Sequence, residues 1–122
     1  MSDYIENFGR SLGLETERDS VGNVLIHKPA SKGMESRKKI ILQAHMDMVP
    51  QKDKDKVHDF LKDPIETHIE SIDGEQWVMA DRTTLGADDG LGCAAIMAVL
   101  ESDTLQHGPL DGFFTRFRTA RS

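Results

Sequence analysis

The sequence predicts an α/β fold, and three observations lead to this prediction. Apolar residues near the N-terminus recur at helical spacing, β-branched runs follow them, and an apolar helical run comes late in the chain. Two helical patterns separated by strands indicate a layered α/β domain rather than an all-β one. The chain of 122 residues has the size of one small domain and contains no internal repeat.

The N-terminal segment predicts a helix followed by two strands. Residues 2–13 form a short amphipathic pattern that Gly13 can end, and its apolar positions are Tyr4, Ile5, Phe8 and Leu12. Residues 14–19 and 23–29 are strand-like and are separated by the turn sequence Ser-Val-Gly-Asn.

The middle of the chain predicts three further strands. Residues 39–44 (KIILQA) form a continuous aliphatic run, which is typical of a strand buried on both faces. A polar stretch follows at 49–64, and then residues 65–72 and 75–80 flank Asp73-Gly74, a strong hairpin signal.

Residues 82–92 (RTTLGADDGLG) are interrupted by glycines and predict a loop, and the apolar run 93–102 predicts a helix. The single cysteine, Cys93, lies in this run and is expected to be a small buried hydrophobe. One cysteine cannot form an internal disulfide, so we expect a reducing, cytoplasmic compartment.

Composition narrows the function classes. The formal charge of −6 argues against nucleic-acid binding, which usually needs a basic surface. No apolar run approaches the length that spans a bilayer, and the N-terminal sequence is not a signal peptide. With 38% hydrophobic and 30% charged residues, the composition is that of an ordinary soluble enzyme.

The first candidate functional motif is His45-Met46-Asp47, directly after the strand at 39–44. Residues two apart in extended chain project to the same side, so the imidazole and the carboxylate are presented together. They lie where a strand leaves the sheet, the usual place for an α/β active site. The motif is short, and a solvated loop explains most such pairs.

The second candidate motif is Gly86-Ala87-Asp88-Asp89-Gly90, before the predicted apolar helix. Each aspartate has a structural explanation, because Asp is favoured at helix N-caps and near the positive end of the helix dipole. The glycines also allow the close backbone approach that a ligand site needs.

Together, a histidine and nearby carboxylates at two chain positions predict a metal site with nitrogen and oxygen ligands. The lack of paired cysteines excludes a structural thiolate site. The other histidines are weaker candidates. We expect His27 and His68 to face solvent, and His58 and His107 have polar surroundings.

The stretches LQAHMDMVPQKDKDKVHDFLKDPI and TTLGADDGLGCAAIMAVL closely resemble the aminoacyl-histidine dipeptidases, also called cytosolic non-specific dipeptidases. These enzymes belong to the co-catalytic zinc exopeptidases. The resemblance runs from about residue 3 to residue 115. It implies a three-layer catalytic domain with a central mixed sheet flanked by helices.

The resemblance also implies roles for three residues. His45 would bind one zinc, Asp88 would bridge two zincs, and Asp47 would act in catalysis by orienting His45. Manganese or cobalt could replace zinc. The implied substrate is a dipeptide, often with a C-terminal histidine. The implied partner of the intact relatives is a second subunit, bound through a lid or dimerisation domain.

The sequence departs from the family pattern at three places. Family members are expected to begin some tens of residues earlier, with an extra N-terminal helix. Arg82 stands where the family usually has glycine, and it would strain the loop if its φ is positive. Residues 1–115 match the N-terminal part of the catalytic domain, but the arginine-rich segment 116–122 does not, which suggests a frameshift, a mis-called gene end or a disordered tail. The general-base glutamate and the remaining zinc ligands are expected after Thr115. The alternative hypothesis is therefore a truncated, non-catalytic remnant.

Overall fold

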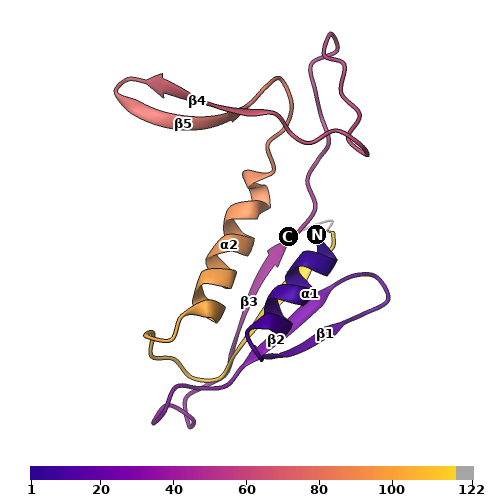
Figure 1. Cartoon of the computed structure of the whole chain (residues 1–122). Helices are drawn as coiled ribbons and strands as arrows, with labels where there is room; N and C mark the ends of the chain where they lie inside the picture. Colours follow the sequence, from indigo (N-terminus) through magenta and orange to yellow (C-terminus); the bar gives the residue numbers. More distant parts are fainter. Residues whose placement is uncertain (118–122) are drawn as a thin grey trace. The chain divides into compact units, whose positions relative to one another are not determined.

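The computed structural model describes residues 1–117, which divide into two compact units (Figure 1). The first unit, here the sheet unit, contains Met1–Asp47 and the chain from Asp89 onward, and the second, the hairpin unit, contains Met48–Asp88. The helices and strands, in chain order, are α1 (Ser2–Ser11), β1 (Glu15–Arg18), β2 (Val24–Lys28), β3 (Ile40–His45), β4 (Thr67–Ile72), β5 (Glu75–Ala80), α2 (Ala87–Glu101) and β6 (Leu110–Thr115).

A four-stranded mixed sheet forms the centre of the sheet unit, with the strand order β1-β2-β6-β3. The pairs β1–β2 and β2–β6 are antiparallel, whereas β3 and β6 are parallel. A mixed sheet with flanking helices confirms the predicted α/β class.

Within the arginine-rich segment 116–122, residues 118–122 lie outside the part of the chain that the structure describes.

Both helices pack on the same face of this sheet. A Cβ added to Gly9 of α1 would lie 2.8 Å from the Ile26 side chain, so the helix and strand are closely packed there. Ile26 pairs with Gly112, and Gly112 lies directly under Ile96 of α2. The buried hydrophobic residues form one core on this face: Ile5, Val24, Ile26, Ala44, Cys93, Ile96, Leu100, Leu110 and Phe114.

Strand β6 is an element that the sequence did not predict. Its sequence, LDGFFT, contains Asp111 and Gly112, which are both uncommon in strands. Gly112 is required because a Cβ there would lie 2.8 Å from Ile96 and 3.0 Å from Leu100. The packing of α2 therefore explains a glycine that weakens the sequence signal for a strand.

The predicted burial of residues 39–44 on both faces is wrong. Ile40 and Ile41 are 49% and 63% exposed, and Ala44 is the buried residue of β3. The physical reason is that both helices pack on one face of the described sheet and Ile41 lies on the other, while β3 is also an edge strand with β6 on one side. The aliphatic run correctly predicts a strand, but not its surroundings.

Helix α2 begins at Ala87, so six residues of the predicted glycine-rich loop are helical. Its last turn contains no basic residue, but Lys28 of β2 donates hydrogen bonds to the carbonyl oxygens of Val99 (2.9 Å) and Ser102 (2.5 Å). A cation at the C-terminal end of a helix interacts favourably with the helix dipole. Cys93 is buried as predicted, and this burial raises the pKa of its thiol.

The hairpin unit confirms the predicted turn at Asp73-Gly74, where both residues have positive φ (50° and 81°). Arg82 also has a positive φ, 56°, which is the strained conformation that the sequence comparison with the family anticipated. Lys56 is the one buried residue among positions 48–88.

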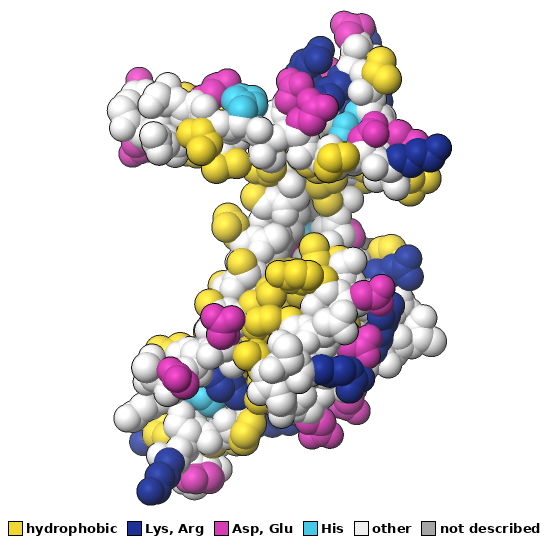
Figure 2. All heavy atoms as spheres, viewed as in Figure 1, with side chains coloured by type: hydrophobic (Ala, Val, Ile, Leu, Met, Phe, Trp, Pro, Cys, Tyr) yellow, Lys and Arg dark blue, Asp and Glu magenta, His cyan; other side chains and the backbone are white. Residues whose placement is uncertain are grey.

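Hydrophobic side chains are visible on the molecular surface (Figure 2). Among residues 1–117, no helix has the length and apolar character that crossing a membrane requires.

Candidate metal centre

His45 and Asp47 lie in contact at the carboxyl end of β3. The His45 Nδ1 atom is 2.9 Å from Asp47 Oδ1 and 3.1 Å from the Asp47 carbonyl oxygen. Their side chains are 18% and 25% exposed, so the pair is partly shielded but still accessible to solvent. The structure therefore brings together the two residues that the sequence predicted to act as a pair.

The backbone around this pair is held by strand β6. The pairing of β3 with β6 extends to His45, which lies opposite Thr115, and the Met46 amide donates to the Thr115 carbonyl oxygen at 2.8 Å. The Cys93 thiol of α2 lies 3.3 Å from the His45 carbonyl oxygen. Contacts from a neighbouring strand and a helix thus fix the position of the His45 backbone.

Asp88 is the second residue of α2 and the last residue of the hairpin unit. A carboxylate in the first helical turn is favoured by the helix dipole, as the structural explanation of the sequence motif predicts. Its neighbour Asp89 accepts a hydrogen bond from the Gly92 amide at 3.1 Å. The role of Asp88 as a metal ligand stays a prediction.

The donor chemistry of His45 and Asp47 is suitable for zinc. A zinc-binding histidine usually directs its other ring nitrogen to a carboxylate or a backbone carbonyl. His45 Nδ1 is hydrogen-bonded to the Asp47 carbonyl oxygen at 3.1 Å, and the Asp47 carboxylate lies beside it at 2.9 Å. This contact assigns Nε2 as the nitrogen that would face a metal. Within residues 1–117 there is no group of three or more His, Cys, Asp or Glu side chains placed to hold a metal ion.

The chain is similar in sequence to one curated protein in particular. It is 54% identical over 115 residues to the cytosol non-specific dipeptidase of Escherichia coli K12, an alignment that covers 94% of this chain. The predicted resemblance to the aminoacyl-histidine dipeptidases is confirmed. No protein-family model matches the chain.

Two solved structures support the same conclusion for the fold. The aminoacylhistidine dipeptidase of Vibrio alginolyticus matches 98% of this chain with a TM-score of 0.85 and 48% identity. The aminopeptidase PepT of Bacillus cereus matches 93% of it with a TM-score of 0.65 and 25% identity. The chain spans about a quarter of the length of its dipeptidase relatives, 23% of the Escherichia coli protein and 24% of the Vibrio protein.

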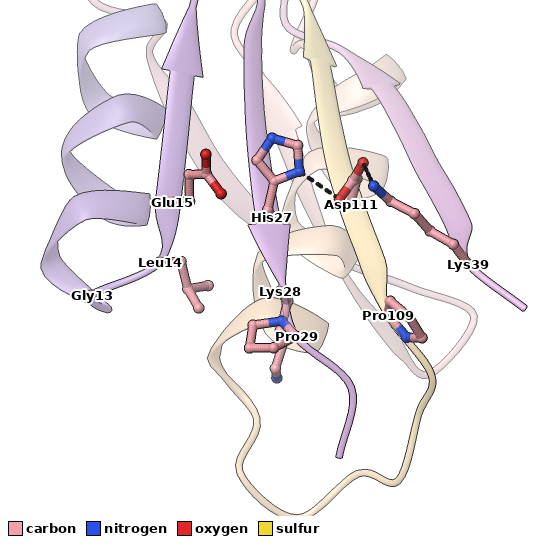
Figure 3. Close-up of a pocket in the computed structure, with 9 residues that line it drawn as sticks. All are labelled: Gly13, Leu14, Glu15, His27, Lys28, Pro29, Lys39, Pro109 and Asp111. Carbon is pink, nitrogen blue, oxygen red and sulfur yellow. Dashed lines mark hydrogen bonds and ion pairs between the residues drawn. The ribbon is translucent and has the colours of Figure 1, made fainter. Parts of the chain in front are cut away.

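A second histidine–carboxylate pair was missed by the sequence analysis. His27 was expected to face solvent, but its Nδ1 atom lies 2.8 Å from Asp111 Oδ1, and its side chain is 26% exposed. Asp111 also forms an ion pair with Lys39, in which Asp111 Oδ2 lies 3.0 Å from Lys39 Nζ (Figure 3). The expectation failed because Asp111 lies on β6, the strand that the sequence did not predict. The dipeptidase resemblance assigns no role to this cluster.

Proposed function

We propose that this chain carries part of the metal site of a zinc-dependent dipeptidase, with His45 and Asp88 as zinc ligands and Asp47 as the residue that orients His45. The observation that carries the proposal is the 2.9 Å contact of His45 with Asp47 at the carboxyl end of β3, in a chain 54% identical to a dipeptidase. The substrates proposed for the whole protein are dipeptides, including those that end in histidine.

The chain's own residues would prepare the ligand rather than perform the hydrolysis. The hydrogen bond from His45 Nδ1 to the Asp47 carbonyl oxygen would fix the tautomer, and the Asp47 carboxylate beside it would make Nε2 a better ligand. When bound, zinc lowers the pKa of a water molecule and polarises the scissile carbonyl. Manganese and cobalt accept the same donors. We propose the cytosol as the compartment, since the Escherichia coli relative is named as a cytosol enzyme.

The second candidate function is a non-catalytic remnant that binds one metal ion at most. It rests on the arginine-rich segment after Thr115, which does not follow the family pattern. Under this proposal the 122-residue chain binds zinc through His45 but hydrolyses no dipeptide. The intact dipeptidase, with its second subunit, would be needed for turnover.

The proposals are tested with the purified chain, its H45A and D47N variants, and H68A as the matched control. His68 is an exposed histidine paired with Glu70 on the hairpin, so H68A removes an imidazole far along the chain from the motif. We expect H45A to abolish zinc binding in calorimetry, D47N to weaken it about 10- to 100-fold, and H68A to leave it unchanged.

Two results would contradict these proposals. Unchanged zinc affinity in H45A would remove His45 as a ligand and, with it, the proposed metal site. Zinc-dependent hydrolysis of glycyl-histidine that copurifies with the 122-residue chain and is lost in H45A would overturn the remnant proposal and establish a working enzyme.

A further inference from the structure

Four charged side chains form an ion-pair network that joins β1, β2 and β6 and ends at the residue before β3. They are Glu17 on β1, His27 on β2, Asp111 on β6 and Lys39, the residue before β3. We propose that this ion-pair network is pH-sensitive. It holds the outer strand β1 to the sheet while His27 is protonated and releases it when His27 is neutral.

The network is continuous in space. His27 Nε2 lies 2.6 Å from Glu17 Oε2, His27 Nδ1 lies 2.8 Å from Asp111 Oδ1, and Asp111 Oδ2 lies 3.0 Å from Lys39 Nζ. Since His27 pairs with Asp111 across β2 and β6, their side chains project from the same face of the sheet. Ile26 and Gly112, the next pair, face the helices, so His27 and Asp111 project from the opposite face, where Lys39 meets Asp111 (Figure 3).

The hydrogen-bonding capacity of imidazole makes this arrangement depend on protonation. A protonated histidine has two N–H donors, and here each ring nitrogen faces a carboxylate oxygen. A neutral histidine has one donor, so one of the two carboxylates would then face a nitrogen lone pair. Loss of the proton must therefore break one of the two contacts.

The contact with Glu17 is the one that breaks. The Asp111 side chain is 6% exposed and is also held by Lys39, so it cannot turn to water. The Glu17 side chain is 61% exposed and can be solvated freely. Strand β1 has four residues and lies at the edge of the sheet, so it depends more than a central strand on such side-chain contacts.

All charged groups that face His27 act in one direction. The hydrogen bond to Glu17 contributes most to raising the pKa of His27, burial opposes it, and Asp111 and then the charge of Glu15 add to the increase. Lys39 faces Asp111 rather than the imidazole, and Lys28 points to α2 on the other face. Because the folded pKa lies above the ordinary value of 6.5, the stabilisation is present below that pH and is lost as pH rises through the folded pKa.

The proposal is tested by an NMR titration of the histidine ring protons in the 122-residue chain, which measures the pKa of His27. The His27 resonance is assigned from the H27Q spectrum. The same chain in concentrated urea supplies the unfolded reference. Glu17→Gln removes the charge that contacts His27 and keeps the side-chain length. Glu15→Gln is the matched control, because it removes an equal charge from the same strand without breaking a contact to the imidazole.

We expect the pKa of His27 to be higher in the native chain than in urea, and E17Q to lower it more than E15Q does. Hydrogen-exchange protection of the β1 amides, corrected for the pH dependence of intrinsic exchange, should fall above the His27 pKa in the native chain and stay constant in H27Q. Equal His27 pKa values in the native and urea-treated chains would overturn the proposal. Hydrogen-exchange protection of the β1 amides that does not change when His27 ionises would also overturn it.

Discussion

The sheet unit and the hairpin unit are stabilised by different interactions. Every residue of the buried hydrophobic core belongs to the sheet unit, where two helices cover one face of four strands. In the hairpin unit the buried residue is a charged one, Lys56, whose ammonium group contacts Asp81 and Glu66. A two-stranded hairpin without a packed face is marginally stable in water.

This difference matters for the proposed metal site. His45 and Asp47 belong to the unit with the core, and Asp88 ends the unit without one. The histidine half of the site is therefore prearranged by packing, through β6 and α2, before any ligand binds. The residues from 48 to 88 depend on hydrogen bonds and ion pairs, which are weaker when they are exposed to water. Three substitutions test this contrast, in order of decreasing effect.

The largest effect is expected from Gly112→Val in the sheet unit. Added side-chain atoms would overlap Ile96 and Leu100, so the variant should lose about 3 kcal/mol of unfolding free energy in urea denaturation. Gly90→Ala is the matched control in α2, where an added Cβ meets nothing within 4 Å. It should stabilise the helix by about 0.5–1 kcal/mol. Equal destabilisation by both variants would show that α2 does not pack on β6.

An intermediate effect is expected from Lys56→Met in the hairpin unit. The Lys56 ammonium group donates to the Asp81 carbonyl oxygen at 2.7 Å and to its carboxylate at 2.9 Å, a pairing that lowers the pKa of Asp81. Without it, hydrogen exchange across 67–80 should accelerate several-fold while the sheet unit is unchanged. Lys54→Met, an exposed lysine nearby, is the control. Acceleration in both units at once would mean that they unfold together.

The smallest effect is expected from Arg82→Gly, which should stabilise the hairpin unit. Arg82 has a φ of 56°, and a left-handed conformation costs a non-glycine residue about 1 kcal/mol. Arg82→Ala is the matched control, because alanine removes the side chain but keeps the Cβ that causes the strain. Protection of the 48–88 amides should increase in R82G and not in R82A, and an increase in both would indicate that the arginine side chain, not the backbone, is unfavourable.

The sequence predicts the elements that carry a strong local signal. The helix at the N-terminus, the turn at Asp73-Gly74 and the apolar stretch of α2 all follow from periodicity or turn chemistry. Strand β6 escapes prediction because its Gly112 is chosen for the approach of α2, a contact between segments distant in sequence. The contact of His27 with Asp111 escapes prediction for the same reason, because Asp111 lies on β6.

For the candidate site, the sequence predicts the His45–Asp47 pair because both residues lie on one short stretch of extended chain. A pair such as His27 and Asp111 is separated by 84 positions, so spacing gives no indication of it. Family resemblance selects between the two pairs, since the local geometry of both is similar: the ring nitrogens lie 2.9 Å and 2.8 Å from their carboxylates.

A zinc titration followed by NMR tests the central claim most directly, because it reports on all five histidines of the chain in one experiment. We predict that zinc shifts the resonances of His45, Met46 and Asp47 and that of Asp88, leaves His27 unchanged, and increases the hydrogen-exchange protection of residues 48–88. Shifts centred on His27 and Asp111, or no shift at His45 at saturating zinc, would contradict the account.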